Sequence, residues 1–135
     1  QIYRDIPKAL SSAAKNDDVS ISILTGTGEY FSSGNDLSQL MAGGVESDNF
    51  SDLLKHKLQL VQNFINALIE YPKVLVAVVN GPAIGIAVTM LGLCDIVYAA
   101  DNATFQTPFT SLGITAEGCS TYTFPRILGS SMVSI

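Results

Sequence analysis

Two glycine-containing turns are the first places in this sequence where backbone groups could do chemistry. Residues 32–36 read SSGND and follow the apolar run 19–25, and residues 80–86 read NGPAIGI and follow the run 74–79. Each turn leads from a predicted buried strand toward a helix, whose first N–H groups lack internal partners. Two such turns side by side could direct two N–H groups at one oxygen, as in an oxyanion hole. They could also be plain connections, and neither has the spacing of a Rossmann or P-loop motif.

Glu117 is the acidic residue that best fits a role in proton transfer. It stands where a helical stretch is predicted to begin. Apolar surroundings would raise the pKa of its carboxyl and make it a stronger base, whereas a helix start would lower that pKa. The sequence leaves open which influence is larger. It also leaves open a simpler interpretation, in which Glu117 only complements the helix dipole.

Three other side chains with chemical potential have simpler interpretations. Asp36 could be a base or a metal ligand, but its place in a turn favours an N-cap or a loop brace. His56 is the only histidine and lies between two lysines, which is typical of a solvated helix surface. Cys119 has no histidine and aspartate placed to activate its thiol, so we interpret it as a small wall residue. No Cys/His cluster has metal spacing, and no metal is expected.

The composition is that of a globular protein. Hydrophobic residues make up 47% of the 135 residues and charged residues only 14%, which suggests that other segments or subunits cover some apolar surface. The net charge is −5 and the seven Lys and Arg residues are scattered, so we expect no nucleic-acid partner. Two cysteines fit a reducing compartment better than a disulfide framework. The chain starts at Gln1 and stops at Ile135, and we expect it to be a piece of a longer protein.

Residues 74–93 form a run of twenty residues without a charge, which is long enough to span a membrane. The triplet Asn80-Gly81-Pro82 interrupts this run and is a turn signal. The first part, 74–79, is rich in β-branched residues, and the last part, 84–93, has a helical character. We therefore predict a strand, a turn and a buried helix, and no membrane segment.

Helical and strand patterns alternate along the chain. Helices are predicted at 2–16, 50–70, 84–93 and from about 117, strands at 19–25, 74–79 and 95–100, a short extended piece at 104–107 and a mobile loop at 38–50. Pro7 fits the first helix only if that helix begins near it. The alternation is typical of βαβ units and a largely parallel sheet in an α/β fold. No repeat or low-complexity linker divides residues 1–135, so we expect one domain.

The segments 30–37 (YFSSGNDL) and 78–113 (VVNGPAIGIAVTMLGLCDIVYAADNATFQTPFTSLG) resemble the two signature regions of the crotonase, or enoyl-CoA hydratase/isomerase, superfamily. The resemblance covers about residues 20–135. It implies a crotonase (ClpP-like) spiral of ββα units, here as an incomplete core that lacks the C-terminal helices of the family. Within the superfamily, residues 115–129 (TAEGCSTYTFPRILG) resemble the peroxisomal-type Δ3,Δ2-enoyl-CoA isomerases.

The resemblance also implies roles for individual residues. The backbone N–H groups of Asn35 and Ile86 would form the oxyanion hole for the thioester carbonyl. The substrate, an acyl-CoA thioester, would lie against the residues around these two turns, namely Ser32, Ser33, Gly34, Asp36, Leu37 and Gly85. Family hydratases carry two glutamates, at positions where this chain has Thr89 and Phe109. The isomerases of the resembled branch use one, which matches Glu117.

The resemblance thus implies an isomerase that converts 3-enoyl-CoA to trans-2-enoyl-CoA in fatty-acid β-oxidation. CoA would enter as part of the substrate, and no other cofactor is expected. Family members are usually trimers or dimers of trimers, and the branch suggests a peroxisomal location, with mitochondria as the alternative. A rival function is a non-catalytic binding module of the chromodomain-Y-like type, which NGPAIG and FQTP also resemble. A dienoyl-CoA isomerase or a thioester hydrolase is a further rival, although those enzymes generally need additional acids.

Overall fold

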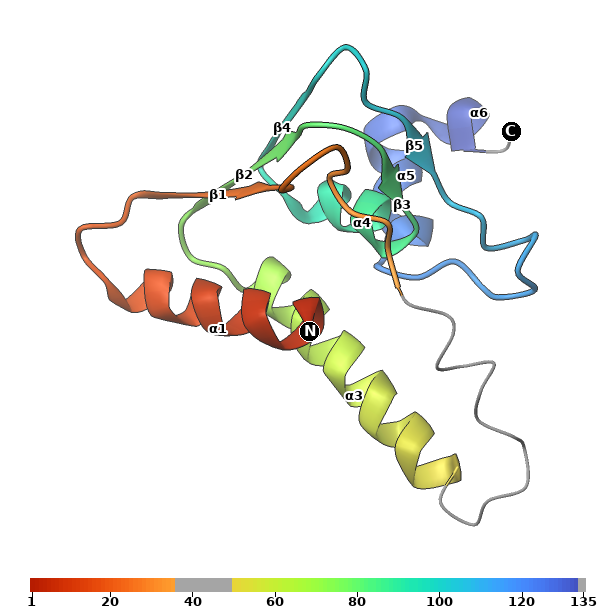
Figure 1. Ribbon diagram of the computed structural model, residues 1–135, viewed down its shortest axis with the longest axis horizontal. Coiled ribbons are helices and arrows are strands. Elements are labelled where there is room, and N and C mark those ends of the chain that lie inside the picture. Colours follow the sequence, from red (N-terminus) through yellow and green to blue (C-terminus); the bar gives the residue numbers. More distant parts are fainter. Residues whose placement is uncertain (36–49, 134–135) are drawn as a thin grey trace.

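The computed structural model describes residues 1–35 and 50–133 of the chain (Figure 1). The predictions for Asp36, for Leu37 and for nearly all of the loop at 38–50 lie outside the described residues.

Three parallel strands form the main sheet. They are β1 (Ile21–Thr25), β2 (Val74–Val79) and β4 (Ile96–Ala99), in the spatial order β1-β2-β4. Parallel neighbours need crossover connections, and the long helix between β1 and β2 provides one. The predicted strands and the parallel sheet are therefore confirmed, each strand being up to two residues shorter than predicted.

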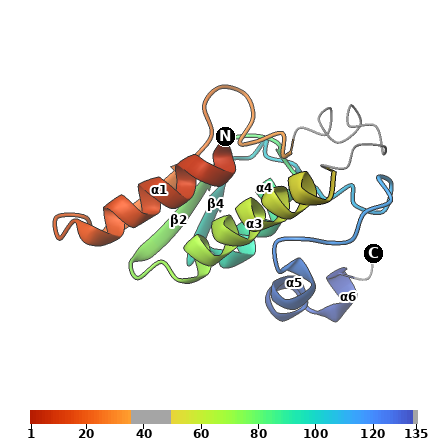
Figure 2. The same cartoon turned by 90° about the horizontal axis from the view of Figure 1, so that it is seen from below.

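Helices α1 (Ile2–Lys15) and α3 (Phe50–Ile69) lie side by side on one face of this sheet (Figures 1 and 2). Their inward side chains pack on the sheet residues that alternate toward the same face. The buried core includes Leu10, Phe64, Leu68, Leu75 and Val79. Burial of this apolar surface is the main contribution that holds the helices on the sheet.

The opposite face of the sheet is apolar and exposed among the described residues. Most of the apolar side chains that alternate toward it are between 37% and 62% exposed, namely Ile21, Ile23, Val74, Val78, Ile96 and Tyr98, whereas Val76 at the centre of this face is 8% exposed. Strand β1 has no buried residue, because its outer side chains are exposed and its inner ones are partly exposed, so the prediction of a buried strand at 19–25 was wrong. This apolar face agrees with the low charge fraction of the sequence.

The segment after β2 differs from the predicted helix 84–93. Strand β3 (Ala83–Ile84) comes first and pairs in parallel with β5 (Phe105–Gln106) in a second, two-stranded sheet. Only then follow a single helical turn, α4 (Ile86–Thr89), and a 3₁₀ turn, η1 (Met90–Leu93). The helix starts late because the backbone of Ala83 and Ile84 is hydrogen-bonded to other segments.

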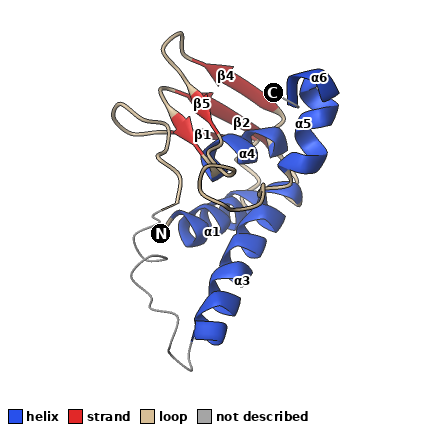
Figure 3. Ribbon diagram, turned by 90° about the vertical axis from the view of Figure 1, so that its right-hand side faces the viewer, coloured by secondary structure: helices blue, strands red, loops and turns tan. Residues whose placement is uncertain are grey.

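The first helix begins at Ile2, as predicted, but Pro7 does not mark its start: the proline lies inside α1, where it cannot donate to the carbonyl four residues earlier. The start of the last predicted helix was wrong. At the other end, α5 (Ser120–Leu128) begins three residues after Glu117 and is followed by the short α6 (Ser130–Val133) (Figure 3). The residue before α5, Cys119, has a left-handed backbone with φ +60°, which a helix starting at 117 could not contain.

No helix in the described ranges is long and apolar enough to cross a membrane. The uncharged run 74–93 is divided among β2, β3, α4 and η1, as the turn signal at Asn80-Gly81-Pro82 indicated.

We predict that Phe64→Ala lowers the free energy of unfolding by about 3–5 kcal/mol, because Phe64 is fully buried and its ring meets Tyr3 edge-on at 5.3 Å. Urea unfolding of the full-length protein would measure this loss. The matched control is Leu58→Ala on the same helix, where the side chain is 60% exposed and the expected change is within about 0.5 kcal/mol. Equal losses in the two variants would contradict the placement of the core.

Candidate active site

The two glycine-containing turns lie against each other, although about fifty residues separate them in the sequence. The backbone N–H groups of Phe31 and Ser32 both donate to the carbonyl of Pro82, at 3.0 and 3.3 Å. In return, the N–H of Ile84 donates to the carbonyl of Ser32 at 3.0 Å. The pairing continues as a bridge between Ser32 and Ala83. The structure therefore brings together the two turns that the sequence singled out.

Gly34 and Gly85 both have left-handed backbones, with φ +83° and +62°. At Gly34 a side chain is also excluded by space, since a Cβ atom would lie 2.5 Å from the carbonyl oxygen of Ile84. The absence of a side chain thus permits the two turns to approach this closely. At Gly85 the backbone N–H donates to the carbonyl of Gln106 at 2.8 Å, which fixes the start of α4.

The backbone N–H groups of Asn35 and Ile86 are available for a ligand. Ile86 is the first residue of α4, and first-turn N–H groups have no partner within the helix. Within residues 1–35 and 50–133, neither N–H donates to a protein acceptor. Both residues line one cavity of about 70 Å³.

Among the described residues, this cavity has mostly apolar walls and one carboxylate. The two turns supply one side of it, and the loop that precedes α5 supplies the other. The lining residues are Ser33, Gly34, Asn35, Ile84, Gly85, Ile86, Pro108, Phe109, Leu112, Ile114 and Glu117. Glu117 and the two available N–H groups therefore share one space, in which a ligand oxygen and an acid/base could meet.

Burial raises the pKa of the Glu117 carboxyl above its ordinary value of 4.5. Removing the charged form from water is the cause, because apolar walls solvate a carboxylate poorly. The opposing influence of a helix start is weak, since α5 begins only at Ser120. Ser120 instead fixes the backbone of Glu117: its N–H and its hydroxyl both donate to the Glu117 carbonyl, at 3.2 and 2.8 Å.

Gly118 fixes the acid against α4, and sequence reasoning missed this residue. Its φ is +64°, and a Cβ atom there would lie 2.2 Å from Thr89 Oγ1 and 3.1 Å from Ile86 Cδ1. Thr89 is fully buried, and its hydroxyl donates to the carbonyl of Ile86 at 3.3 Å. Glu117 and the Ile86 N–H are thus held by the same short helix. A glycine directly after the candidate acid was the available signal.

The remaining predicted residues fall into three groups. Ser33, Gly34 and Gly85 line the cavity, whereas Ser32 lies behind it and uses its hydroxyl to accept from the N–H of Gly34 at 3.2 Å. Asp36 and Leu37 lie outside the described residues. His56 and Cys119 are exposed and do not line the cavity. Among the described residues, no three His, Cys, Asp or Glu side chains gather as metal ligands would.

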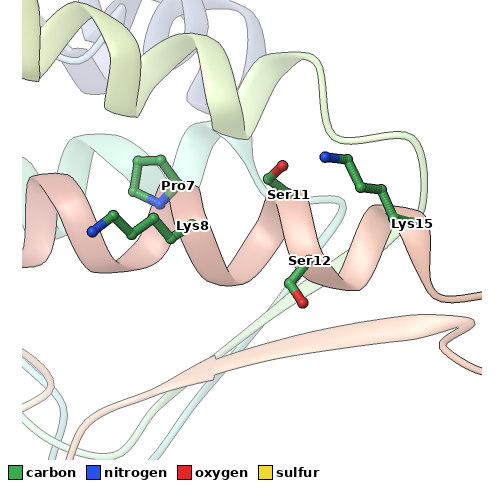
Figure 4. A pocket seen from close by; sticks show the side chains of 5 residues that line it. All are labelled: Pro7, Lys8, Ser11, Ser12 and Lys15. Carbon is green, nitrogen blue, oxygen red and sulfur yellow. The ribbon is translucent and has the colours of Figure 1, made fainter.

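A second hollow, of about 500 Å³, follows the outer surface of α1. Its lining side chains, Pro7, Lys8, Ser11, Ser12 and Lys15, all come from this one helix (Figure 4). Because no other element contributes a group to it, it offers no convergent chemistry, and the smaller cavity at Glu117 is the candidate site.

We predict that Gly118→Ala destabilises the protein more than Gly113→Ala does. Both glycines have nearly the same φ, +64° and +65°, but a Cβ atom at Gly113 meets nothing within 4 Å. The left-handed backbone should cost about 1–2 kcal/mol in each variant, and the overlap with Thr89 about 1–3 kcal/mol more at 118. Urea unfolding would compare them, and the addition of Thr89→Ala should recover part of the extra loss. Equal costs for the two alanines would show that Gly118 does not pack on Thr89.

We predict that Glu117→Gln stabilises the protein at pH 7. A carboxyl whose pKa is raised by folding binds its proton more tightly in the folded state, so its favourable contribution is present below pH 4.5 and is lost as the pH rises through the folded pKa. The difference between Glu117→Gln and the native protein should therefore grow with pH above 4.5. Thermal unfolding at several pH values would measure it, with the exposed Glu70→Gln as control. A wild type more stable than Glu117→Gln at pH 7 would refute the burial effect.

The chain is similar to known proteins of one family. The profile of the family described as enoyl-CoA hydratase/isomerase matches residues 1–134. Human enoyl-CoA delta isomerase 2 is 50% identical over 131 residues, 95% of this chain and 32% of that protein. Mouse "enoyl-CoA delta isomerase 3, peroxisomal" is 49% identical over 129 residues, 96% of this chain and 39% of that protein. The chain thus spans about a third of the length of these curated relatives.

Two further comparisons bear on the fold and on the rival function. Human chromodomain Y-like protein 2 is 38% identical over 134 residues, 99% of this chain and 26% of that protein. The crystal structure of an enoyl-CoA hydratase from a Polaromonas species is 28% identical with a TM-score of 0.86, over 98% of this chain and 50% of that one. The resemblance drawn from residues 30–37 and 78–113 is therefore confirmed: the chain belongs to the enoyl-CoA hydratase/isomerase family and has the crotonase fold.

Proposed function

We propose that the full-length protein is an isomerase that converts 3-enoyl-CoA, cis or trans, to trans-2-enoyl-CoA in the β-oxidation of unsaturated fatty acids. The observation that carries this proposal is the carboxylate of Glu117, which among the described residues is the one acid in an apolar cavity that the backbone N–H groups of Asn35 and Ile86 also line. The similarity to enoyl-CoA delta isomerases supports the same reaction class.

In the proposed reaction, the N–H groups of Asn35 and Ile86 donate to the thioester carbonyl oxygen. Ionised Glu117 removes a proton from C2, and the electron pair of that C–H bond delocalises over the dienolate, whose oxygen the two N–H groups stabilise. Protonated Glu117 then returns the same proton at C4, which leaves the double bond between C2 and C3. A raised pKa suits a carboxyl that must both take and return a proton.

The two-glutamate route of the hydratases does not fit this cavity. Thr89 and Phe109 stand where the family resemblance places those glutamates, and both side chains are buried. Neither side chain exchanges a proton near neutral pH. One carboxylate is enough for an allylic shift, because the proton that leaves the substrate is the one that returns.

The rest of the substrate and the assembly complete the proposal. Ser33, Gly34 and Gly85 on the cavity wall would contact the thioester region, and Ser32, Asp36 and Leu37 would lie along the CoA moiety. The chemistry needs no metal or redox cofactor, since the proton and the electrons both stay within the substrate and Glu117. We propose a homotrimer or a dimer of trimers for the full-length protein. A peroxisomal location has the support of one relative that carries this word in its name.

The second candidate function is a non-catalytic module that binds CoA or a protein, as the similarity to a chromodomain Y-like protein suggests. The carboxylate favours the isomerase over this candidate. A pure binding site gains nothing from an acid whose charge is poorly solvated, because burying it costs free energy.

We predict that Glu117→Gln lowers kcat for 3-enoyl-CoA about 10²–10⁴-fold in the full-length protein, because the amide cannot transfer a proton. The 3-enoyl-CoA isomerase assay measures this, with calorimetric binding of CoA to show that the pocket is intact. Glu70→Gln, an exposed glutamate outside the cavity, should leave kcat unchanged. Equal rates for Glu117→Gln and wild type would refute the assignment. CoA binding without turnover in the wild type would support the binding module instead.

A further inference from the structure

The side chain of Asn80 bridges the place where strands β1 and β2 separate. The two strands run in register as far as Thr25 and Val78, after which the chain from β1 loops outward while the chain from β2 continues into its turn. Asn80 Oδ1 accepts from the N–H of Gly26 at 2.9 Å. Its Nδ2 donates to the carbonyl of Gly28 at 2.9 Å and faces that of Tyr30 at 3.5 Å. Both ends of the amide are therefore used.

The loop 26–31 folds tightly over Asn80 and the residue after it. A Cβ atom at Gly26 would lie 2.6 Å from Asn80 Oδ1 and 2.3 Å from the carbonyl oxygen of Tyr30. At Gly81 a Cβ atom would lie 2.0 Å from the carbonyl oxygen of Glu29. This close fit demands a planar group with an acceptor at one end and a donor at the other, which is what an amide side chain provides.

This loop leads directly into the first turn of the candidate site. After Tyr30, the N–H groups of Phe31 and Ser32 donate to the carbonyl of Pro82, and the Ser32 carbonyl accepts from Ile84. Asn35 follows three residues later, and Ile86 follows Ile84 by two. Hydrogen bonds thus connect the two chain segments from Asn80 as far as Ser32 and Ile84, a few residues before the two available N–H groups. Asn80 itself does not line the cavity.

We propose that Asn80 is a positioning residue that sets the Asn35 N–H relative to the Ile86 N–H, an inference that rests on the proposed isomerase reaction. It acts through the backbone of loop 26–32 and touches no substrate. A displacement of about 1 Å at a catalytic group can lower the rate about 100-fold. Since the two N–H groups stabilise charge that develops in the transition state, loss of the Asn80 contacts should lower kcat more than it weakens substrate binding. Glu117 is fixed separately, by Gly118 and Ser120.

The test is Asn80→Asp in the full-length protein. Aspartate keeps the acceptor for Gly26 but cannot donate to the Gly28 carbonyl, and its charge repels that oxygen. We expect kcat per folded molecule to fall about 10–100-fold with KM changed less than about 3-fold, and the pH dependence of kcat to keep its midpoint. The control is Asn102→Asp, an exposed turn residue, which should behave as wild type.

A second readout separates this inference from the proposed function. Hydrogen exchange of the peptides that contain Phe31, Ser32 and Ile84 should become faster in Asn80→Asp and stay as in wild type in Asn102→Asp, whether or not the protein is an isomerase. If the wild type has no isomerase activity, the function fails while faster exchange still supports the positioning. An active wild type with unchanged kcat and exchange in Asn80→Asp would overturn the inference alone. If Asn80→Asp does not fold, the same measurements are made on Asn80→Ser, for which we expect a smaller decrease in kcat. Unchanged kcat and unchanged hydrogen exchange in Asn80→Ser would also overturn the inference.

Discussion

The backbone hydrogen bonds between the two turns are the interaction on which the candidate site depends. These contacts use the N–H groups of Phe31, Ser32 and Ile84. The N–H of Gly34 donates to Ser32 Oγ, and the N–H of Gly85 donates to the Gln106 carbonyl. The residues just before Asn35 and Ile86 are thus already bonded. An oxyanion hole needs donors that are fixed before the reaction, and backbone contacts provide this with any side chain at either position.

The electrostatics of Glu117 follow from where the next helix begins. A carboxylate in the first turn of a helix is stabilised by the helix dipole, which lowers its pKa. The left-handed backbone at Cys119 delays α5 to Ser120, so burial in the apolar cavity determines the direction of the shift. The late start of α5 thus leaves burial as the cause that raises the pKa of the Glu117 carboxyl.

Elements with strong hydrophobic periodicity could be predicted from the sequence. The predictions were wrong where contacts with distant segments determine the local structure. The pattern of 50–70 indicated α3 because apolar residues recur on one face. The pattern of 84–93 misled, because Ala83 and Ile84 pair with Phe105 and Gln106, a partner about twenty residues away. The glycine turns were visible as turns, but their contact was not. Asn80 was interpreted only as part of a turn signal, since nothing local reveals which carbonyls its amide meets.

The choice between one acid and two follows from packing as well as from chemistry. A glutamate at position 89 would need room that the Gly118 backbone occupies, because Thr89 already leaves no space for a Cβ atom at 118. Displacing Gly118 would also displace Glu117, the adjacent residue. A glutamate at position 89 would therefore disturb Glu117, which supports the proposed use of a single carboxylate. Thr89 and Gly118 together keep that carboxylate beside the helix that offers the Ile86 N–H.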